Sequence, residues 1–375
     1  MTSNRRRHLP KRRLLFRRTT LIVITLLLAA FTIGGYTALR AHDKSMSGDE
    51  RKLNTNLLTA PSPSQTAAAN AKVAKPHRKR HRPRPKPTPT PTAIPPTSTG
   101  TSNANCSGAP NTPGGADPWG GCWPGPDNTG PPQGTSLAAY HGSCTISANN
   151  AVIDAKLINC SLTVTGSNVT IENSEINGTV HNDSSGHLLI SNSVLNGGSD
   201  QSETVGGNDI TISGSNLYGD QHEFHCGSDC TLENSWLHNN FNGASLGWHQ
   251  NGFLSNGGSN FTIVNNSVYC VGGCTADITF IPDGNISNAT VSKNLLVASP
   301  DSAFCLYPSS DPPAKPGIVE EMTIVDNVFQ RGANGKCATY GAVYGWDAPN
   351  NSLNTDGYHN VWSGNMWNNG QVLGP

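Results

Sequence analysis

Apolar and polar residues alternate in short runs between about residues 134 and 370 of this 375-residue chain. The run NVTIENSEINGT, residues 168–179, is followed by DITISGSNLYGD, NFTIVNNSVYC and EMTIVDNVFQRG, among others. Each run places mostly β-branched residues at every second position, and most runs end near Asn or Gly. Alternation of this kind predicts a short β-strand with one buried face.

The runs align on one small or amide residue that stands two positions before the last apolar residue. These anchor residues are Ser174, Ser193, Ser215, Ser235, Asn266, Asn294, Asn327 and Asn365. Successive anchors are 19, 22, 20, 31, 28, 33 and 38 positions apart. A repeat near 20 residues with one strand in each unit is typical of a solenoid, because a single unit cannot bury its apolar face alone. We therefore predict an all-β, single-stranded parallel coil in which the anchors turn inward at a corner and hydrogen-bond from rung to rung. An antiparallel sandwich stays open as the alternative, since short strands with Asn-Gly turns also fit hairpins.

This form of repeat resembles the right-handed parallel β-helix superfamily of pectate-lyase-like proteins. Within it, the chain is most similar to uncharacterised secreted or membrane-anchored β-helix proteins of actinobacterial type. The resemblance covers about residues 134–370 and implies a right-handed coil. It also implies that loops stacked on one side form a groove for an extended polysaccharide.

The later repeats are longer than the early ones, so their additional residues are expected to leave the coil as loops. These loops fall within residues 236–259, 269–286, 297–320 and 330–359. Loops on a rigid scaffold often carry binding and catalytic residues. The aromatic and imidazole side chains in these segments are Trp236, His238, Trp248, His249, Tyr269, Phe280, Tyr307, Tyr340, Tyr344 and Trp346. Such rings suit sugar binding, although about half are expected to cap the core or pack the loops. The binding candidates are Trp236, Trp248, Trp346, Asn251 and Arg331.

Catalytic candidates come from WLHNNFNGASLGWHQNGF, which looks like the IH…HxDG pattern of many β-helix proteins. In that pattern His238 and His249 would face the groove, while Asn251 replaces the expected acid. A glycosidase needs two carboxylates, and neighbouring rungs could place Asp220 or Glu223 against Asp277. Asp229 and Asp283 are further acidic residues of this region.

A lyase is a separate possibility that the resemblance raises. It would require Arg331, the one arginine after residue 115, as base, and calcium to bridge acidic protein and acidic substrate. A neutral or amino-sugar polymer would require no cofactor. The tetrapeptide NTDG, residues 354–357, matches one polygalacturonase signature, but the remaining motifs of that family do not follow it.

Charge divides the chain into two halves. Residues 1–115 hold 20 basic and 3 acidic residues, a net charge of +17, and the remainder holds 5 basic and 22 acidic residues, a net charge of −17. We expect a basic cytoplasmic tail (1–18), an uncharged transmembrane anchor or signal segment (19–39), a disordered Pro/Thr-rich basic linker (40–115) and the β-helix domain (116–375). In both interpretations of residues 19–39 the domain is exported, either as a membrane-anchored protein or as a secreted one.

All ten cysteines lie at or after residue 106, which agrees with an oxidising compartment. Proximity favours the pairs Cys106–Cys122, Cys144–Cys160, Cys226–Cys230, Cys270–Cys274 and Cys305–Cys337. A metal site is the alternative interpretation of HEFHCGSDC, where His222 and His225 stand beside two cysteines, but the spacing is not that of a zinc finger.

Two classes of function follow. One is a surface enzyme that binds and cleaves a polysaccharide, and the other is a non-catalytic β-helix that adheres to a wall polymer. In both cases we expect a monomer that contacts a polysaccharide and the membrane, and no nucleic-acid partner, because the basic run of the linker lies beyond the membrane.

Overall fold

A computed structural model of the protein describes residues 106–375 except residue 240, residues 310–316 and residues 347–357. The predicted tail, the predicted membrane segment at 19–39, most of the linker and the NTDG tetrapeptide lie outside the described residues. Among the residues that are described, no helix has the length and apolar character needed to cross a membrane.

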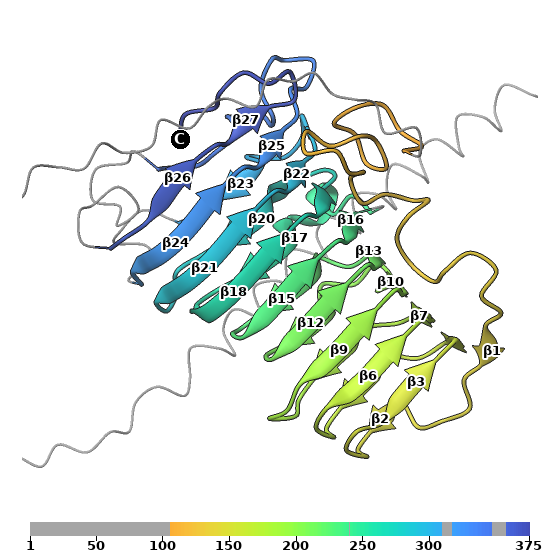
Figure 1. Ribbon diagram of the computed structural model, residues 1–375. Helices are drawn as coiled ribbons and strands as arrows, with labels where there is room; N and C mark the ends of the chain where they lie inside the picture. The colour runs from red at the N-terminus through yellow and green to blue at the C-terminus, as the bar shows by residue number, and fades with distance from the viewer. Residues whose placement is uncertain (1–105, 240, 310–316, 347–357) are drawn as a thin grey trace, which may run out of the picture. The chain divides into compact units, whose positions relative to one another are not determined.

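The described chain winds through three sheets (Figure 1), which we number in the order that the chain visits them after its first strand. Sheet 1 consists of β2 (Thr145–Ile146), β5 (Leu162–Val164), β8 (Val180–Asn182), β11 (Glu203–Gly207), β14 (His222–Cys226), β17 (Gln250–Ser255), β20 (Cys274–Phe280) and β23 (Leu306–Tyr307). Sheet 2 consists of β3 (Val152–Asp154), β6 (Val169–Glu172), β9 (Leu188–Ser191), β12 (Ile210–Ser213), β15 (Cys230–Glu233), β18 (Gly258–Val264), β21 (Ile286–Ser292), β24 (Val319–Val325) and β26 (Val361–Ser363). Sheet 3 consists of β1 (Ala138–Ala139), β4 (Lys156–Ile158), β7 (Glu175–Asn177), β10 (Val194–Asn196), β13 (Asn216–Tyr218), β16 (Trp236–His238), β19 (Ser267–Tyr269), β22 (Leu295–Leu296), β25 (Val328–Phe329) and β27 (Met366–Trp367). One short 3-10 helix, η1 (Ala244–Leu246), lies in a loop.

Neighbouring strands within all three sheets are parallel. Each strand from β1 to β22 pairs with the strand three places later in the chain, and in the last rung β24 pairs with β26 and β25 with β27. This order is that of a coil with three strands in each rung. The predicted all-β parallel solenoid is confirmed, and the antiparallel sandwich is excluded for the described chain.

The predicted ladder of anchor residues lies at the corner between sheets 2 and 3. The backbone N–H of each anchor donates to the side-chain oxygen of the next anchor, at 2.9–3.2 Å, from Ser174 to Asn365. All eight anchors are buried. Because a buried N–H without an acceptor is costly, the ladder explains why this position accepts only a small hydroxyl or an amide.

Apolar side chains from the three sheets fill the inside of the coil. The residues predicted to face inward in the early rungs, Val169, Ile171 and Ile176, are at most 1% exposed. In later rungs Phe253, Phe261 and Phe280 pack edge to face or tilted, with ring centroids 5.4–6.2 Å apart. Larger rings therefore fill the interior of the wider rungs.

A segment that we call the N-terminal strap, residues 106–130, packs against sheet 3. Trp123 is fully buried in a small cluster with Leu295, Val328 and Met366. The Gln330 side chain donates to the backbone oxygen of Asn111 at 2.6 Å. Residues 106–115, which the sequence assigns to the linker, are thus described as part of this strap.

The five disulfides connect the pairs that sequence proximity favours. The Cys226–Cys230 bond excludes the zinc interpretation of HEFHCGSDC, since both of its thiols are oxidised.

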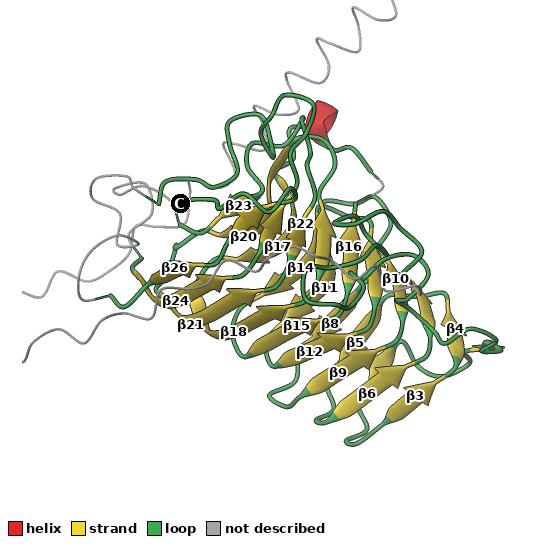
Figure 2. Cartoon of the chain, turned by 45° about the horizontal axis from the view of Figure 1, so that its top comes forward, coloured by secondary structure: helices red, strands yellow, loops and turns green. Residues whose placement is uncertain are grey.

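The additional residues of the later rungs leave the coil mainly between sheets 3 and 1. This connection spans residues 159–161 and 178–179 in early rungs, but 239–249 and 297–305 in later ones. Figure 2 shows these loops gathered at one side of the stack, opposite the short turns between sheets 1 and 2.

Candidate functional site

Sheet 1 departs from simple alternation, because two consecutive residues of its strands face the interior. Phe253 belongs to the core, yet a side chain added to the preceding Gly252 would meet the core residue Val268 at 2.4 Å. One rung later, the N–H groups of Asp277 and Ile278 both donate to the backbone oxygen of Cys305. The strands therefore bend at this pair of positions.

The bend makes residues on either side of it converge on the outer face of sheet 1. The rings of His222 and His225 are centred 5.8 Å apart although they are three positions apart in an extended strand. In the next two rungs the Thr279 hydroxyl donates to the Asn251 amide oxygen. A line of polar groups thus runs along this face of sheet 1, and Asn251 and Thr279 within it are buried, at 1% and 0% exposure.

The hydrogen bonds of Asn251 fix the protonation state of His222. The Asn251 amide nitrogen donates to the backbone oxygen of His249 at 3.0 Å, which identifies it as the nitrogen rather than the oxygen. The same nitrogen lies 3.2 Å from His222 Nδ1, which must then be an unprotonated acceptor. Burial lowers the pKa of His222 to about 3, and the neighbouring His225 adds to this effect. His222 is therefore neutral at pH 7, with its proton on Nε2.

Two carboxylates share one imidazole in the earlier rungs of the same face. His181 Nδ1 lies 2.6 Å from Asp183 Oδ1, and its Nε2 lies 3.5 Å from Glu203 Oε1. Glu203 pairs in register with His222, so this group continues directly into the histidine pair. All three side chains are partly exposed.

An open cleft of about 430 Å³ lies at the later rungs of sheet 1. Its lining residues are His249, Gly273, Cys274, Thr275, Asp301, Ser302, Ala303, Tyr307, Thr339 and Tyr340. The rings of Tyr307 and Tyr344 stack at 4.3 Å, and Phe304 lies between Tyr340 and this pair. Tyr307 pairs in register with Thr279, so the cleft continues the polar line. Polar and aromatic groups of this kind can hold a sugar ring by stacking and hydrogen bonding.

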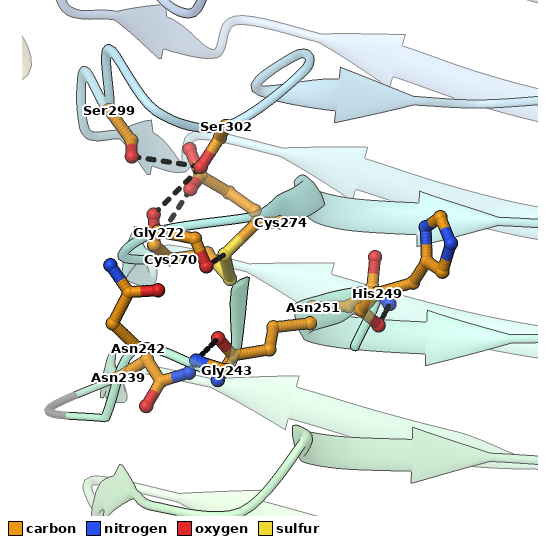
Figure 3. The surroundings of a disulfide bond; sticks show 12 residues. Asn239, Asn242, Gly243, His249, Asn251, Cys270, Gly272, Cys274, Ser299 and Ser302 are labelled. Carbon is orange, nitrogen blue, oxygen red and sulfur yellow. Dashed lines mark hydrogen bonds between the residues drawn. A yellow bond between two sulfur atoms is a disulfide. The ribbon is translucent and has the colours of Figure 1, made fainter. Parts of the chain in front are cut away.

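Successive loops between sheets 3 and 1 support the cleft (Figure 3). The Cys270–Cys274 disulfide closes one loop, and the Ser302 hydroxyl of the next loop donates to the backbone oxygen of Cys270 at 3.0 Å. Gln250 stabilises the loop before them, since its side chain accepts from the Gly243 N–H at 2.6 Å and donates to the Phe241 backbone oxygen at 3.0 Å. The lining is therefore held by covalent and buried polar contacts.

The acidic residues proposed as a catalytic pair lie inside the protein. Asp220, Glu223 and Asp277 are all 0% exposed. Glu223 in the rung before Gly252, and Asp277 in the rung after it, stand at the same strand position as Gly252. The bend turns this second residue of each strand inward. Neither oxygen of Glu223 has a hydrogen-bond partner among the described residues, and Asp277 accepts one bond, from the Cys270 N–H at 2.9 Å. The structure does not bring these acids to the cleft.

Burial controls how these acids ionise. It raises the pKa of Glu223 well above its usual range, and the nearby Asp277 and Asp220 raise it further. Burial also raises the pKa of Asp277, against the effect of the Cys270 N–H, and that of Asp220. The folded protein therefore favours the protonated, neutral form of Glu223 and Asp277.

His238 and Trp236 lie on the outer face of sheet 3, apart from the cleft. Their rings stack at 3.7 Å, and His238 Nε2 lies 2.8 Å from the Asn216 side-chain oxygen. Burial lowers the pKa of His238 to about 4. His238 and His249 thus belong to different parts of the rung, and only His249 lines the cleft.

The remaining candidates have structural contacts. Trp346 is buried in the main core beside Trp362, and Trp248 packs on Phe241 in the loop that carries His249. The Arg331 guanidinium lies over the Trp367 ring, at 4.4 Å from its centroid, and donates to Gln371. Asp229 and Asp283 accept hydrogen bonds from Asn260 and Asn256 at turns between sheets 1 and 2.

Sequence reasoning missed the polar line formed by Asp183, His181, Glu203, His222 and His225. His222 and His225 were considered only as metal ligands, and Glu203 stands in ETVGG, which lacks the repeat pattern. The one available signal was the recurrence of His or Glu near the start of successive sheet 1 strands.

Within the described part of the chain, no group of three or more His, Cys, Asp or Glu residues is arranged to hold a metal ion. The chain matches no family model, and comparisons with curated proteins and with solved structures found no match.

Proposed function

We propose that this chain is a surface-tethered, right-handed β-helix protein of pectate-lyase-like type whose sheet 1 face binds an extracellular polysaccharide. The observation that carries this proposal is the cleft of about 430 Å³ that continues the polar line of sheet 1. A long polymer needs a site that extends over several rungs. At about 4.8 Å per rung, the roughly seven rungs from His181 to Tyr344 extend roughly 29 Å.

The composition of this face suits carbohydrate. Tyr340 is 69% exposed beside the stacked Tyr307 and Tyr344, so aromatic surface is offered at one end. Histidine and carboxylate groups at the other end supply hydrogen bonds to hydroxyl groups. The disulfides agree with an extracellular location, and the basic N-terminal third would provide the membrane tether.

A glycan panel tests the proposal. The full-length chain is incubated with neutral, amino-sugar and uronate oligomers, with and without calcium, and binding is measured by calorimetry. We expect at least one oligomer to bind wild type and to bind Tyr340→Ala about 5- to 30-fold more weakly, the range for loss of an aromatic contact in a binding site. Trp119→Ala, which removes an aromatic residue of the N-terminal strap that is 37% exposed, is the control and should bind like wild type. No binding to any oligomer would contradict the proposal.

Hydrolysis of the bound glycan is a second candidate function, favoured by the two carboxylates on either side of His181. A glycosidase requires such a pair on the substrate face, and the buried acids do not provide one. The same panel, assayed for reducing ends, tests it. Release of reducing ends that is lost in both Asp183→Asn and Glu203→Gln would support hydrolysis, and binding without turnover would support adhesion.

A further inference from the structure

The sheet 1 face has carboxylates and no lysine or arginine among the described residues. Asp301 lines the cleft, and Glu203 and Asp183 stand along the polar line. Each described lysine or arginine lies elsewhere. Lys156 is in β4 of sheet 3, Lys293 lies over Trp119 of the strap, and Arg331 lies over Trp367.

The remaining cation, Lys336, lines a separate cleft of about 250 Å³ at the last rung. The two clefts have only Tyr340 in common. None of the four described Lys and Arg residues therefore lines the larger cleft.

Such a surface selects among sugars by charge. It repels a polyuronate, and it attracts a polymer that carries ammonium groups. The tyrosines add to this preference, because the face of an aromatic ring attracts a cation. Tyr340 and the stacked Tyr307 stand in the same cleft as Asp301, so an ammonium group there would meet a ring face and a carboxylate together.

We propose that the cleft lined by Asp301, Tyr307 and Tyr340 binds a cationic amino-sugar polymer, in which free amino groups replace acetamido groups. This inference rests on the glycan binding proposed above and names its substrate class. The carboxylates recognise the ammonium groups and the tyrosines stack on the sugar rings.

The test compares three hexamers on the full-length chain at pH 6: glucosamine, N-acetylglucosamine and galacturonate. Calorimetry at low salt should show that the glucosamine hexamer binds about 5- to 30-fold tighter than its acetylated form, the range expected from cation–π and carboxylate contacts. This advantage should shrink as salt increases, because the contacts are electrostatic. Asp301→Asn should weaken binding of the glucosamine hexamer about two- to fivefold, and Asp301→Lys should weaken it more.

Glu321→Gln, an exposed change on β24 of sheet 2, is the control and should leave all three affinities unchanged. Every variant keeps the basic N-terminal arm, so binding to that arm cancels when variants are compared with the same hexamer. The amino and acetylated hexamers, whose comparison decides the test, carry no negative charge that the arm would attract. Equal affinity for the amino and acetylated hexamers, or tighter binding of the acetylated one, would overturn the charge preference while leaving glycan binding in place. Failure of all three hexamers while a neutral oligomer of the panel binds would overturn the amino-sugar inference alone, and failure of the whole panel would overturn both proposals.

Discussion

Glu223→Gln should change how the stability of the protein depends on pH. Glu223 is fully buried, and neither of its carboxyl oxygens has a hydrogen-bond partner among the described residues. Its pKa is raised well above the usual range, chiefly by burial. The unfolded chain therefore loses this proton near pH ~4.3, whereas the folded protein keeps it to a much higher pH.

The size of the effect follows from proton linkage. Above about pH 4.3 the folded state binds one more proton at Glu223 than the unfolded state does. The free energy of unfolding then falls by about 1.4 kcal/mol per pH unit for this group, up to the folded pKa. Glutamine has a similar volume and does not titrate, so the variant loses this contribution. Relative to wild type, Glu223→Gln should become more stable by about 1.4 kcal/mol for each pH unit above about pH 5.

Urea unfolding followed by tryptophan fluorescence at pH 5, 6 and 7 measures this difference. Asp277 contributes a second slope and also raises the pKa of Glu223, so the same comparison is made between Asp277→Asn and the Glu223→Gln/Asp277→Asn double variant. Glu321→Gln, which changes an exposed glutamate, is the matched control and should follow the wild-type profile. Parallel profiles for wild type and Glu223→Gln would refute the reasoning, because they would mean that Glu223 ionises equally in both states.

Three further predictions concern His222, the anchor ladder and the strap. Asn251→Asp should raise the pKa of His222 by about 1–3 units, because a carboxylate replaces the amide that now lies 3.2 Å from Nδ1. An NMR titration in which the pKa of His222 did not change would show that the two side chains are not in contact. Asn294→Ala should lower the free energy of unfolding by about 1–3 kcal/mol, because the buried N–H of Asn266 loses its acceptor, whereas the exposed Asn159→Ala should have little effect in the same urea assay. Trp123→Ala should cost about 3–5 kcal/mol locally and speed hydrogen exchange in residues 106–130, and unchanged exchange there would show that Trp123 does not hold the strap.

The repeat made most of the fold predictable. The anchor residues stand at a corner that recurs in every rung, so eight copies of one pattern reported the same buried environment. The disulfides Cys226–Cys230 and Cys270–Cys274 were predictable for a similar reason, since residues at the ends of consecutive strands are close in both sequence and space. Physical constraints of this local kind can be read from a chain without its coordinates.

The candidate site was less predictable because it depends on the bend of sheet 1. Simple alternation cannot place two neighbouring residues on the same face, so Glu223 and Asp277 were expected in a groove and lie inside the coil. Rung length also does not tell which loop side chain turns inward, so it could not predict that Trp346 is a core residue. Of the two predicted histidines, His249 lies in a loop that lines the cleft, whereas His238 lies in a regular strand of sheet 3.

Hydrogen–deuterium exchange of the full-length chain with a saturating oligosaccharide tests the central claim most directly. The account predicts protection in the loop 297–305, in β20 and β23 and along β14, which together form the sheet 1 face. Protection confined to the N-terminal arm, or to the strap and the outer face of sheet 3, would contradict it.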